Sequence, residues 1–160
     1  MKRLLIIDAQ NMFVRNWVLS PAMDLNGNTI GGVAGFMKSL QKEIRELKPD
    51  KVIICWEGGG GSQRRRALNK DYKAGRKAPR LNREFQLPTA EGEKENKLRQ
   101  QLRLMEYLDQ MPVTQMSLES QEADDIIGWL CSCREFDEWA KIIVSSDKDF
   151  IQLCDDKTVL

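Results

Sequence analysis

Three short runs of consecutive apolar residues stand out along the chain, at residues 4–7, 52–56 and 142–144. They are rich in Leu, Ile and Val and lack polar alternation, which is typical of parallel strands covered on both faces. Residues 113–116, just after a proline, form a weaker fourth candidate, and the final DKTVL has the pattern of another strand beginning. The pattern therefore predicts a mostly parallel sheet, in a chain that we expect to be a fragment of a longer protein.

Between these runs, apolar residues recur at the three- and four-residue steps of amphipathic helices. We predict helices over residues 33–47, 98–108 and 120–133, and we expect Ser120 to cap the third. Alternating strands and helices indicate one α/β domain over residues 1–160, with right-handed crossovers. The residues that carry the patterns are Val33, Met37, Leu40, Ile44, Leu47, Leu98, Leu102, Met105 and Leu108, with Ile126, Ile127 and Leu130 expected to point inward in the third helix.

Residues 58–93 do not fit this alternation. Four consecutive glycines lead into a basic block and then into a polar stretch with two prolines, and apolar periodicity is weak throughout. A connection of this length in a compact domain is usually functional or mobile. The glycine run lacks the G-x-x-x-x-G-K-[ST] order of a Walker loop, so we do not expect nucleotide binding there.

The composition narrows the possible chemistry. The chain contains no histidine, which excludes Ser-His and Cys-His nucleophiles. The spacing of the four cysteines is not that of a disulfide framework or a common zinc set, and no apolar run is long enough to span a membrane. Without a targeting signal, the sequence favours a reduced cytoplasmic protein.

The net charge of +1 conceals two opposed blocks. Residues 62–85 contain nine Lys or Arg and two acids, whereas residues 117–156 contain eleven acids and three Lys or Arg. Such asymmetry favours a basic surface beside an acidic pocket, although two solvated faces of an ordinary protein remain an alternative.

An acidic residue follows each of the three clear strands. Asp8 follows the first, Glu57 the second and Asp147 the third, with Asp149 two residues further on. The carboxyl ends of parallel strands open into one crevice where ligands bind, so we expect these four side chains to converge.

Three more carboxylates, Glu122, Asp124 and Asp125, begin the helix after the weak fourth strand and face the same rim. They either complement the helix dipole or join the cluster. Seven carboxylates in one crevice would raise one another's pKa unless divalent cations separate them. Oxygen-only ligands predict Mg²⁺ or Mn²⁺, and two ions would suit displacement at a phosphodiester.

The basic block provides cations for a polyanionic substrate. Its contacts to backbone phosphates would be independent of sequence and sensitive to salt, and Tyr72 could stack on a base. Solubility is the simpler explanation for Arg66 and Lys70. The other basic residues of the block are Arg64, Arg65, Lys73, Arg76 and Lys77.

Four segments together resemble the 5′-nuclease family, which includes phage 5′-to-3′ exonucleases, the small nuclease domain of bacterial DNA polymerase I and flap endonucleases. They are LLIIDAQNMFVR, VIICWEGGGGSQRRRALNKDYKAGR, SQEADDIIG and IVSSDKDFIQL, in the family's order. The resemblance implies a PIN-like α/β domain in a bacterial cytoplasm or a phage-infected host, and we expect the chain to be a monomer. It also implies Mg²⁺-dependent cleavage of DNA at a 5′ flap, a nick or a free 5′ end, or of RNA in RNA–DNA hybrids.

The resemblance also implies roles for individual residues. Tyr72, Lys73 and Arg76 match an element of the family's helical arch, whose Lys and Arg steer the scissile phosphate with help from Arg64 or Arg65. Glu57 stands where the family usually has Asp. The implied metal ligands, direct or through water, are Asp8, Glu122, Asp124, Asp125, Asp147 and Asp149.

The family's helix–three-turn–helix region, which grips duplex DNA, has no match in this sequence. Its place would lie beyond Leu160. Two other functions therefore stay open beside the metal-dependent 5′ nuclease: a PIN-type ribonuclease that acts on single-stranded RNA, and a nucleic-acid-binding module without catalytic activity.

Overall fold

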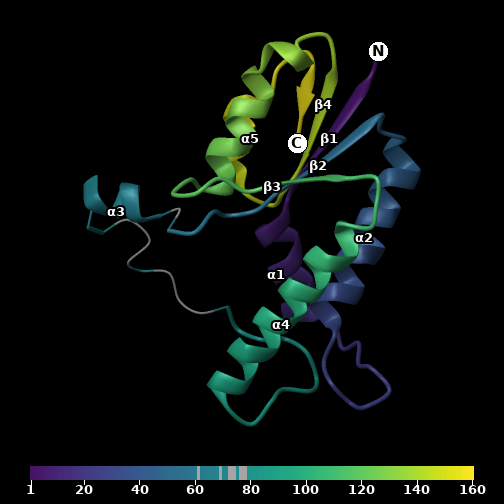
Figure 1. Cartoon of the computed structure of the whole chain (residues 1–160), viewed down its shortest axis with the longest axis vertical. Helices are drawn as coiled ribbons and strands as arrows, with labels where there is room; N and C mark the ends of the chain where they lie inside the picture. Colours follow the sequence, from purple (N-terminus) through teal and green to yellow (C-terminus); the bar gives the residue numbers. More distant parts are fainter. Residues whose placement is uncertain (61, 69, 72–74, 76–78) are drawn as a thin grey trace. The chain divides into compact units, whose positions relative to one another are not determined.

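Five strands pair in parallel into one sheet in the computed structural model of the chain, which describes residues 1–60, 62–68, 70–71, 75 and 79–160 (Figure 1). The order across the sheet is β3-β2-β1-β4-β5, and every neighbouring pair is parallel. The three clear runs and the weak fourth candidate are confirmed as strands, and the DKTVL segment adds the short β5. The bounds are β1 Arg3–Asp8, β2 Lys51–Cys55, β3 Thr114–Met116, β4 Ala140–Val144 and β5 Thr158–Val159.

The three predicted helices are confirmed as α2, α4 and α5, whereas α1 and the short α3 were not predicted. No helix in the described ranges is long and apolar enough to cross a membrane. The bounds are α1 Ala9–Leu19, α2 Gly31–Leu47, α3 Gln63–Leu68, α4 Ala90–Leu108 and α5 Ala123–Ser132, with 3₁₀ helices η1 Arg134–Phe136 and η2 Lys148–Leu153.

Two details of the predicted helices are wrong. Ser120 does not cap α5, because it adopts a left-handed conformation (φ 60°) two residues before the N-cap, Glu122. In α4 the predicted positions Leu98 and Leu102 are more than half exposed, and the buried apolar side chains are those of Leu104 and Leu108.

The chain forms two compact units, each with its own packing. The first comprises Met1–Asn11, Pro49–Ala78 and Val113–Leu160, and contains the sheet. Helix α5 packs on β1 and β2, as Figure 1 shows. Its inward residues are those that the sequence predicts, and its Trp129 is exposed. The core on this face consists of Leu4, Ile6, Ile53, Cys55, Ala123, Ile126, Ile127, Leu130, Phe136, Ile143 and Phe150.

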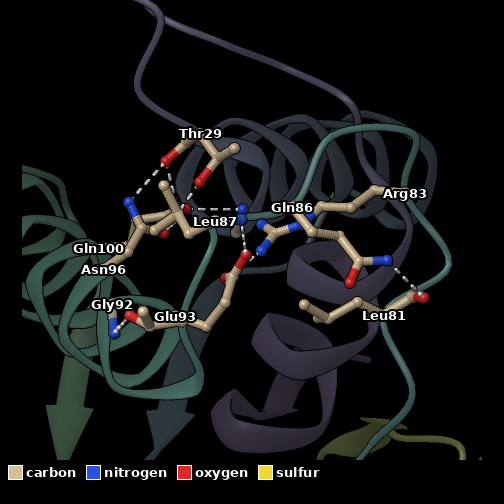
Figure 2. Close-up of polar contacts among 11 residues, drawn as sticks. Thr29, Leu81, Arg83, Gln86, Leu87, Gly92, Glu93, Asn96 and Gln100 are labelled. Atoms are coloured by element: carbon tan, nitrogen blue, oxygen red, sulfur yellow. Dashed lines mark hydrogen bonds and ion pairs between the residues drawn. The ribbon is translucent and has the colours of Figure 1, made fainter.

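The second unit comprises Met12–Lys48 and Pro79–Pro112, where α2 packs against α4. Gln100 of α4 satisfies the first turn of α2, because its Oε1 accepts hydrogen bonds from the backbone N–H groups of Gly32 (2.8 Å) and Val33 (3.2 Å). Its Nε2 donates to the carbonyl oxygen of Thr29 at 2.8 Å, as Figure 2 shows. A buried side chain from α4 therefore replaces the missing cap at Ile30, where no side-chain cap bond forms.

A buried ion pair fixes the chain just before α4. The side chain of Arg83 is fully buried and pairs with Glu93, whose other oxygen accepts from the backbone N–H of Leu87 at 2.6 Å (Figure 2). The guanidinium carbon of Arg83 lies 5.3 Å from the ring centroid of Trp17, and the backbone N–H of Asn82 donates to the carbonyl oxygen of Val18 at 3.0 Å. Arg83 therefore belongs to the interior, not to the basic surface that its place in the sequence indicates.

We expect Glu93→Gln to lower the free energy of unfolding by about 3 kcal/mol, because it leaves the charge of Arg83 buried without a countercharge. Glu95→Gln on the same helix is the matched control. Glu95 pairs with Arg99 in solvent, so its loss should change stability by less than about 0.5 kcal/mol. Urea unfolding of both variants measures the difference, and equal losses would contradict a structural role for the buried pair.

Candidate functional site

Carboxylates from separate segments meet at the carboxyl edge of the sheet. Asp8 is the last residue of β1, Glu57 lies two residues after β2, and Asp147 lies three residues after β4. All of these strands run parallel, so their ends open on the same edge. The acids that end or follow β1, β2 and β4 therefore belong to segments at the same edge of the sheet.

Asp8 is the buried member of this set, with 6% of its surface exposed. One carboxylate oxygen accepts from the backbone N–H of Asn11 (3.0 Å) and the other from the hydroxyl of Ser145 (2.9 Å). Burial raises the pKa of Asp8, and the negative charges of Glu57 and Asp147 raise it further, whereas the two hydrogen bonds oppose this rise. The charges of three segments therefore interact at one buried carboxylate.

The loop after β4 is organised by its own polar groups. Asp147 caps η2, because its side chain accepts from the backbone N–H of Asp149 at 3.0 Å. The backbone N–H of Asp147 donates to the hydroxyl of Ser145 at 3.1 Å. Asp149 is exposed in the first turn of η2. These bonds tie the backbone of Asp147 to Ser145 and its side chain to the first turn of η2, while Asp149 is exposed to solvent.

The three acids at the start of α5 have different surroundings. Glu122 is fully buried and forms a capping box with Asp125, whose carboxylate accepts from the backbone N–H of Glu122 at 3.3 Å. Asp124 is half-buried in the first turn, and Asp125 is exposed. Two of the three carboxylates thus serve the beginning of the helix, as the dipole alternative requires, and Asp124 is the one without a role in the capping box.

Gly58 fixes the backbone that carries Glu57. A Cβ at this position would lie 1.7 Å from the carbonyl oxygen of Leu118, so no other residue fits without a backbone shift. Its N–H donates to the carbonyl oxygen of Gln121 at 3.0 Å. The segment after β2 is therefore bound to the residue that precedes Glu122, the N-cap of α5.

The donor set fits a hard divalent cation, because it consists of carboxylate, hydroxyl and amide oxygens with no histidine. In the described part of the chain, no group of three or more Asp, Glu or Cys side chains is already arranged to hold a metal ion. The acidic edge is thus a set of separate carboxylates joined through hydrogen bonds and charge.

The predicted substrate-binding residues fall mostly outside what the structure describes. Tyr72, Lys73, Arg76 and Lys77 lie outside the described residues. Arg64 and Arg65 lie on α3, and their side chains are likewise not described.

Comparison with known families decides the class of the protein. The model of the "5'-3' exonuclease, N-terminal resolvase-like domain" family matches residues 3–160. The chain belongs to this exonuclease family.

Members of the family with related sequences include DNA polymerase I of Streptococcus pneumoniae serotype 4, 33% identical over 165 residues, and DNA polymerase I of Bacillus subtilis, 29% identical over 160 residues. Each match covers 99% of this chain but only 17% and 16% of the polymerase, respectively. A 5'-3' exonuclease of Bacillus subtilis is 28% identical over 97% of this chain and 49% of its own length. The chain therefore spans between a sixth and a half of these relatives.

Solved structures of the bacteriophage T5 D15 protein share the fold of this exonuclease-family chain. The structure co-crystallised with metal ions superposes with a TM-score of 0.71 at 16% identity, covering 98% of this chain and 54% of that one. The T5 flap endonuclease in a complex with DNA and metal ions gives a TM-score of 0.69 at 15% identity, covering 98% and 53%. This likeness confirms the predicted PIN-like α/β fold.

Three polar residues at the acidic edge were missed by the sequence reasoning: Asn11, Ser145 and Ser146. The backbone N–H and the hydroxyl of Ser146 each donate to the side-chain oxygen of Asn11 at 3.0 Å. Their proximity to Asp147 and Asp8 in the sequence is a weak signal, because serine and asparagine are common in loops for other reasons.

We expect the thiol of Cys55 to resist chemical modification while the protein is folded. Burial raises its pKa to about 12, with a further contribution from the negative charge of Asp8, its neighbour across β1 and β2. At pH 8 the thiol is protonated as well as buried, whereas Cys154 is exposed.

Titration with a thiol reagent at pH 8, followed by mass spectrometry, measures the order of modification. Cys154 should react first and Cys55 only after denaturation. Modification of Cys55 at the rate of Cys154 in the native protein would contradict the packing of this edge.

Proposed function

We propose that the chain is a divalent-metal-dependent 5′ nuclease that hydrolyses phosphodiesters at a 5′ flap, a nick or a free 5′ end. One observation carries the proposal within the family: the charges of Glu57 and Asp147 act on buried Asp8 at the edge where parallel strands end. An edge that gathers like charges around a buried carboxylate favours a cation.

The residues that would hold Mg²⁺ or Mn²⁺, directly or through water, are the acids of this edge. The hydroxyl of Ser145 contacts the carboxylate of Asp8 and the backbone N–H of Asp147, and Asp124 is the half-buried acid of α5. A bound pair of such ions would supply Lewis acidity and a more acidic water. The chain's own contribution is to orient these oxygens through Ser145 and Asn11. We assign weaker or water-mediated roles to Glu57, Glu122, Asp125 and Asp149.

We propose that the basic block binds the phosphate backbone. Lys73 and Arg76 would steer the scissile phosphate, and Arg64, Arg65 and Lys77 would neutralise neighbouring phosphates while Tyr72 stacks on a base. RNA in an RNA–DNA hybrid is a second substrate in this proposal, because phosphate contacts do not read sequence. We further propose that the chain acts as a monomer in a reducing cytoplasm, which its four free cysteines suit.

We expect cleavage of a 5′-flap DNA to require Mg²⁺ or Mn²⁺. The cleavage rate should fall more than about 100-fold in Asp147→Asn, because removing a metal ligand lowers activity more than removing a group that only orients the ligand. Asp137→Asn, an exposed acid beyond η1 and before β4, is the control and should keep full activity. Gel assays with metal and with excess EDTA measure both effects.

Undiminished cleavage in EDTA would contradict the metal-dependent mechanism. Faster cleavage of single-stranded RNA than of flap DNA would favour the ribonuclease alternative. Salt-sensitive DNA binding without turnover at any metal concentration would favour the non-catalytic module.

We expect Lys73→Ala and Arg76→Ala to weaken DNA binding and to reduce the slope of log K against log salt by about 1 each, since each removes one phosphate contact. Arg66→Ala and Lys70→Ala are matched controls within the same segment, and both residues are exposed. Fluorescence anisotropy between about 50 and 200 mM salt measures the slopes. Equal slopes for all four variants would contradict the proposal that Lys73 and Arg76 contact phosphates and Arg66 and Lys70 do not.

A further inference from the structure

A closed ring of hydrogen bonds joins the start of α1 to the loop after β4. Its members are Asp8, Asn11, Ser145 and Ser146, which we call the Asn11–Ser145 ring. Asp8 accepts from the backbone of Asn11 and from the hydroxyl of Ser145, and the side chain of Asn11 accepts twice from Ser146. The covalent link between Ser145 and Ser146 closes the ring, and its hydrogen bonds between α1 or Asp8 and the loop after β4 join residues 135 and 137 positions apart.

The ring fixes the orientation of both carboxylate oxygens of Asp8. Asn11 is the third residue of α1, so its N–H is one of the donors that a helix leaves unsatisfied, and Asp8 accepts it as an N-cap does. The other oxygen accepts from Ser145. Two donors from different elements thus prevent rotation of this carboxylate.

Ser145 has no freedom to reverse its hydroxyl. A hydroxyl has one proton and two acceptor lone pairs. The oxygen accepts from the backbone N–H of Asp147 at 3.1 Å, and its single proton is donated to Asp8. One hydroxyl therefore contacts the carboxylate at the end of β1 and the backbone of the acid after β4.

Asn11 supports the same loop from the other side. Its side-chain oxygen accepts from both the backbone N–H and the hydroxyl of Ser146, at 3.0 Å each. Together with Ser145, it holds two successive residues of the loop against the first turn of α1. Asp147 follows directly, so the position of its backbone is set by these contacts.

We infer that Ser145 and Asn11 are positioning residues that orient the carboxylate of Asp8 and set the backbone of Asp147 for a divalent cation, an inference that rests on the proposed function. Neither side chain needs to contact the ion. Groups that orient metal ligands in this way typically change metal affinity 10–100-fold when they are removed. The ring is thus the second layer of the cation site.

Calorimetric titration with Mn²⁺ tests this inference on the intact chain. We expect Ser145→Ala and Asn11→Ala to weaken binding about 10–100-fold. Ser145→Thr keeps the hydroxyl and should restore affinity close to the wild type. Ser132→Ala is the matched control, because the Ser132 hydroxyl bonds to carbonyl oxygens of its own helix, Gly128 and Trp129, and its loss should leave affinity unchanged.

Cleavage assays measure the Mn²⁺ concentration for half-maximal activity, a quantity that a purely structural role of Ser145 would leave unchanged. In Ser145→Ala the Mn²⁺ concentration for half-maximal cleavage should rise with the dissociation constant, while cleavage at saturating Mn²⁺ recovers. Urea unfolding without metal shows whether each variant is folded. If Ser145→Ala does not fold, Asn11→Ala and Ser145→Thr supply the comparison.

The outcomes separate this inference from the proposed function. If the wild type binds Mn²⁺ and cleaves DNA but Ser145→Ala and Asn11→Ala bind as tightly, the positioning role is overturned and the nuclease proposal stands. If the wild type binds no Mn²⁺, both are overturned. Failure of Ser145→Thr to restore binding would likewise overturn the role of the hydroxyl.

Discussion

The parallel pairing of every strand is the constraint on which the rest of the structure depends, because it brings the ends of distant segments to one edge. Asp8 is the buried carboxylate at this edge, and the negative charges of Glu57 and Asp147 add to the rise that burial causes in its pKa. Its folded-state pKa is raised, so folding favours the protonated form, and the ionised form costs stability as the pH rises through that pKa. A cation at this edge would remove that cost.

Polar side chains satisfy the first turns of several helices. In each of four helices a different side-chain acceptor satisfies N–H groups of the first turn, and one of these acceptors, Gln100 at the start of α2, comes from a distant part of the sequence. At α1 and α5 the side chains that accept from the first-turn N–H groups are themselves acids of the candidate site. The same hydrogen bonds therefore stabilise the start of the helix and orient the carboxylates of the site. The acceptors are Asp8 for α1, Gln100 for α2, Thr89 for α4, and Glu122 with Asp125 for α5.

Patterns of apolar residues predicted the strands and the three longer helices, because burial against a sheet or a neighbouring helix requires them. The patterns failed where polar groups decide the outcome. Leu98 and Leu102 share a helical face, yet the buried face of α4 includes Glu93 and Gln100, whose partners lie elsewhere in the chain. Arg83 likewise counted as a surface cation until its pairing with Glu93 placed it in the interior. A buried polar residue is recognisable only with its partner, and the sequence alone does not name that partner.

The candidate site likewise contains residues that the sequence pattern predicts and residues that only the structure identifies. Topology alone predicted that Asp8, Glu57 and Asp147 would share an edge, since strand ends are visible in the sequence. Ser145 and Asn11 became recognisable only once the register between β1 and β4 was known, because their contacts span more than 130 positions. Glu57 was predicted from its place after a strand, but the contact that fixes its backbone is seen only in the structure. Gly58 fixes the backbone behind it through a contact that tolerates no side chain, so the additional methylene of Glu relative to Asp must extend the carboxylate rather than shift the strand. The longer arm therefore changes how far the charge reaches from β2, not where it originates.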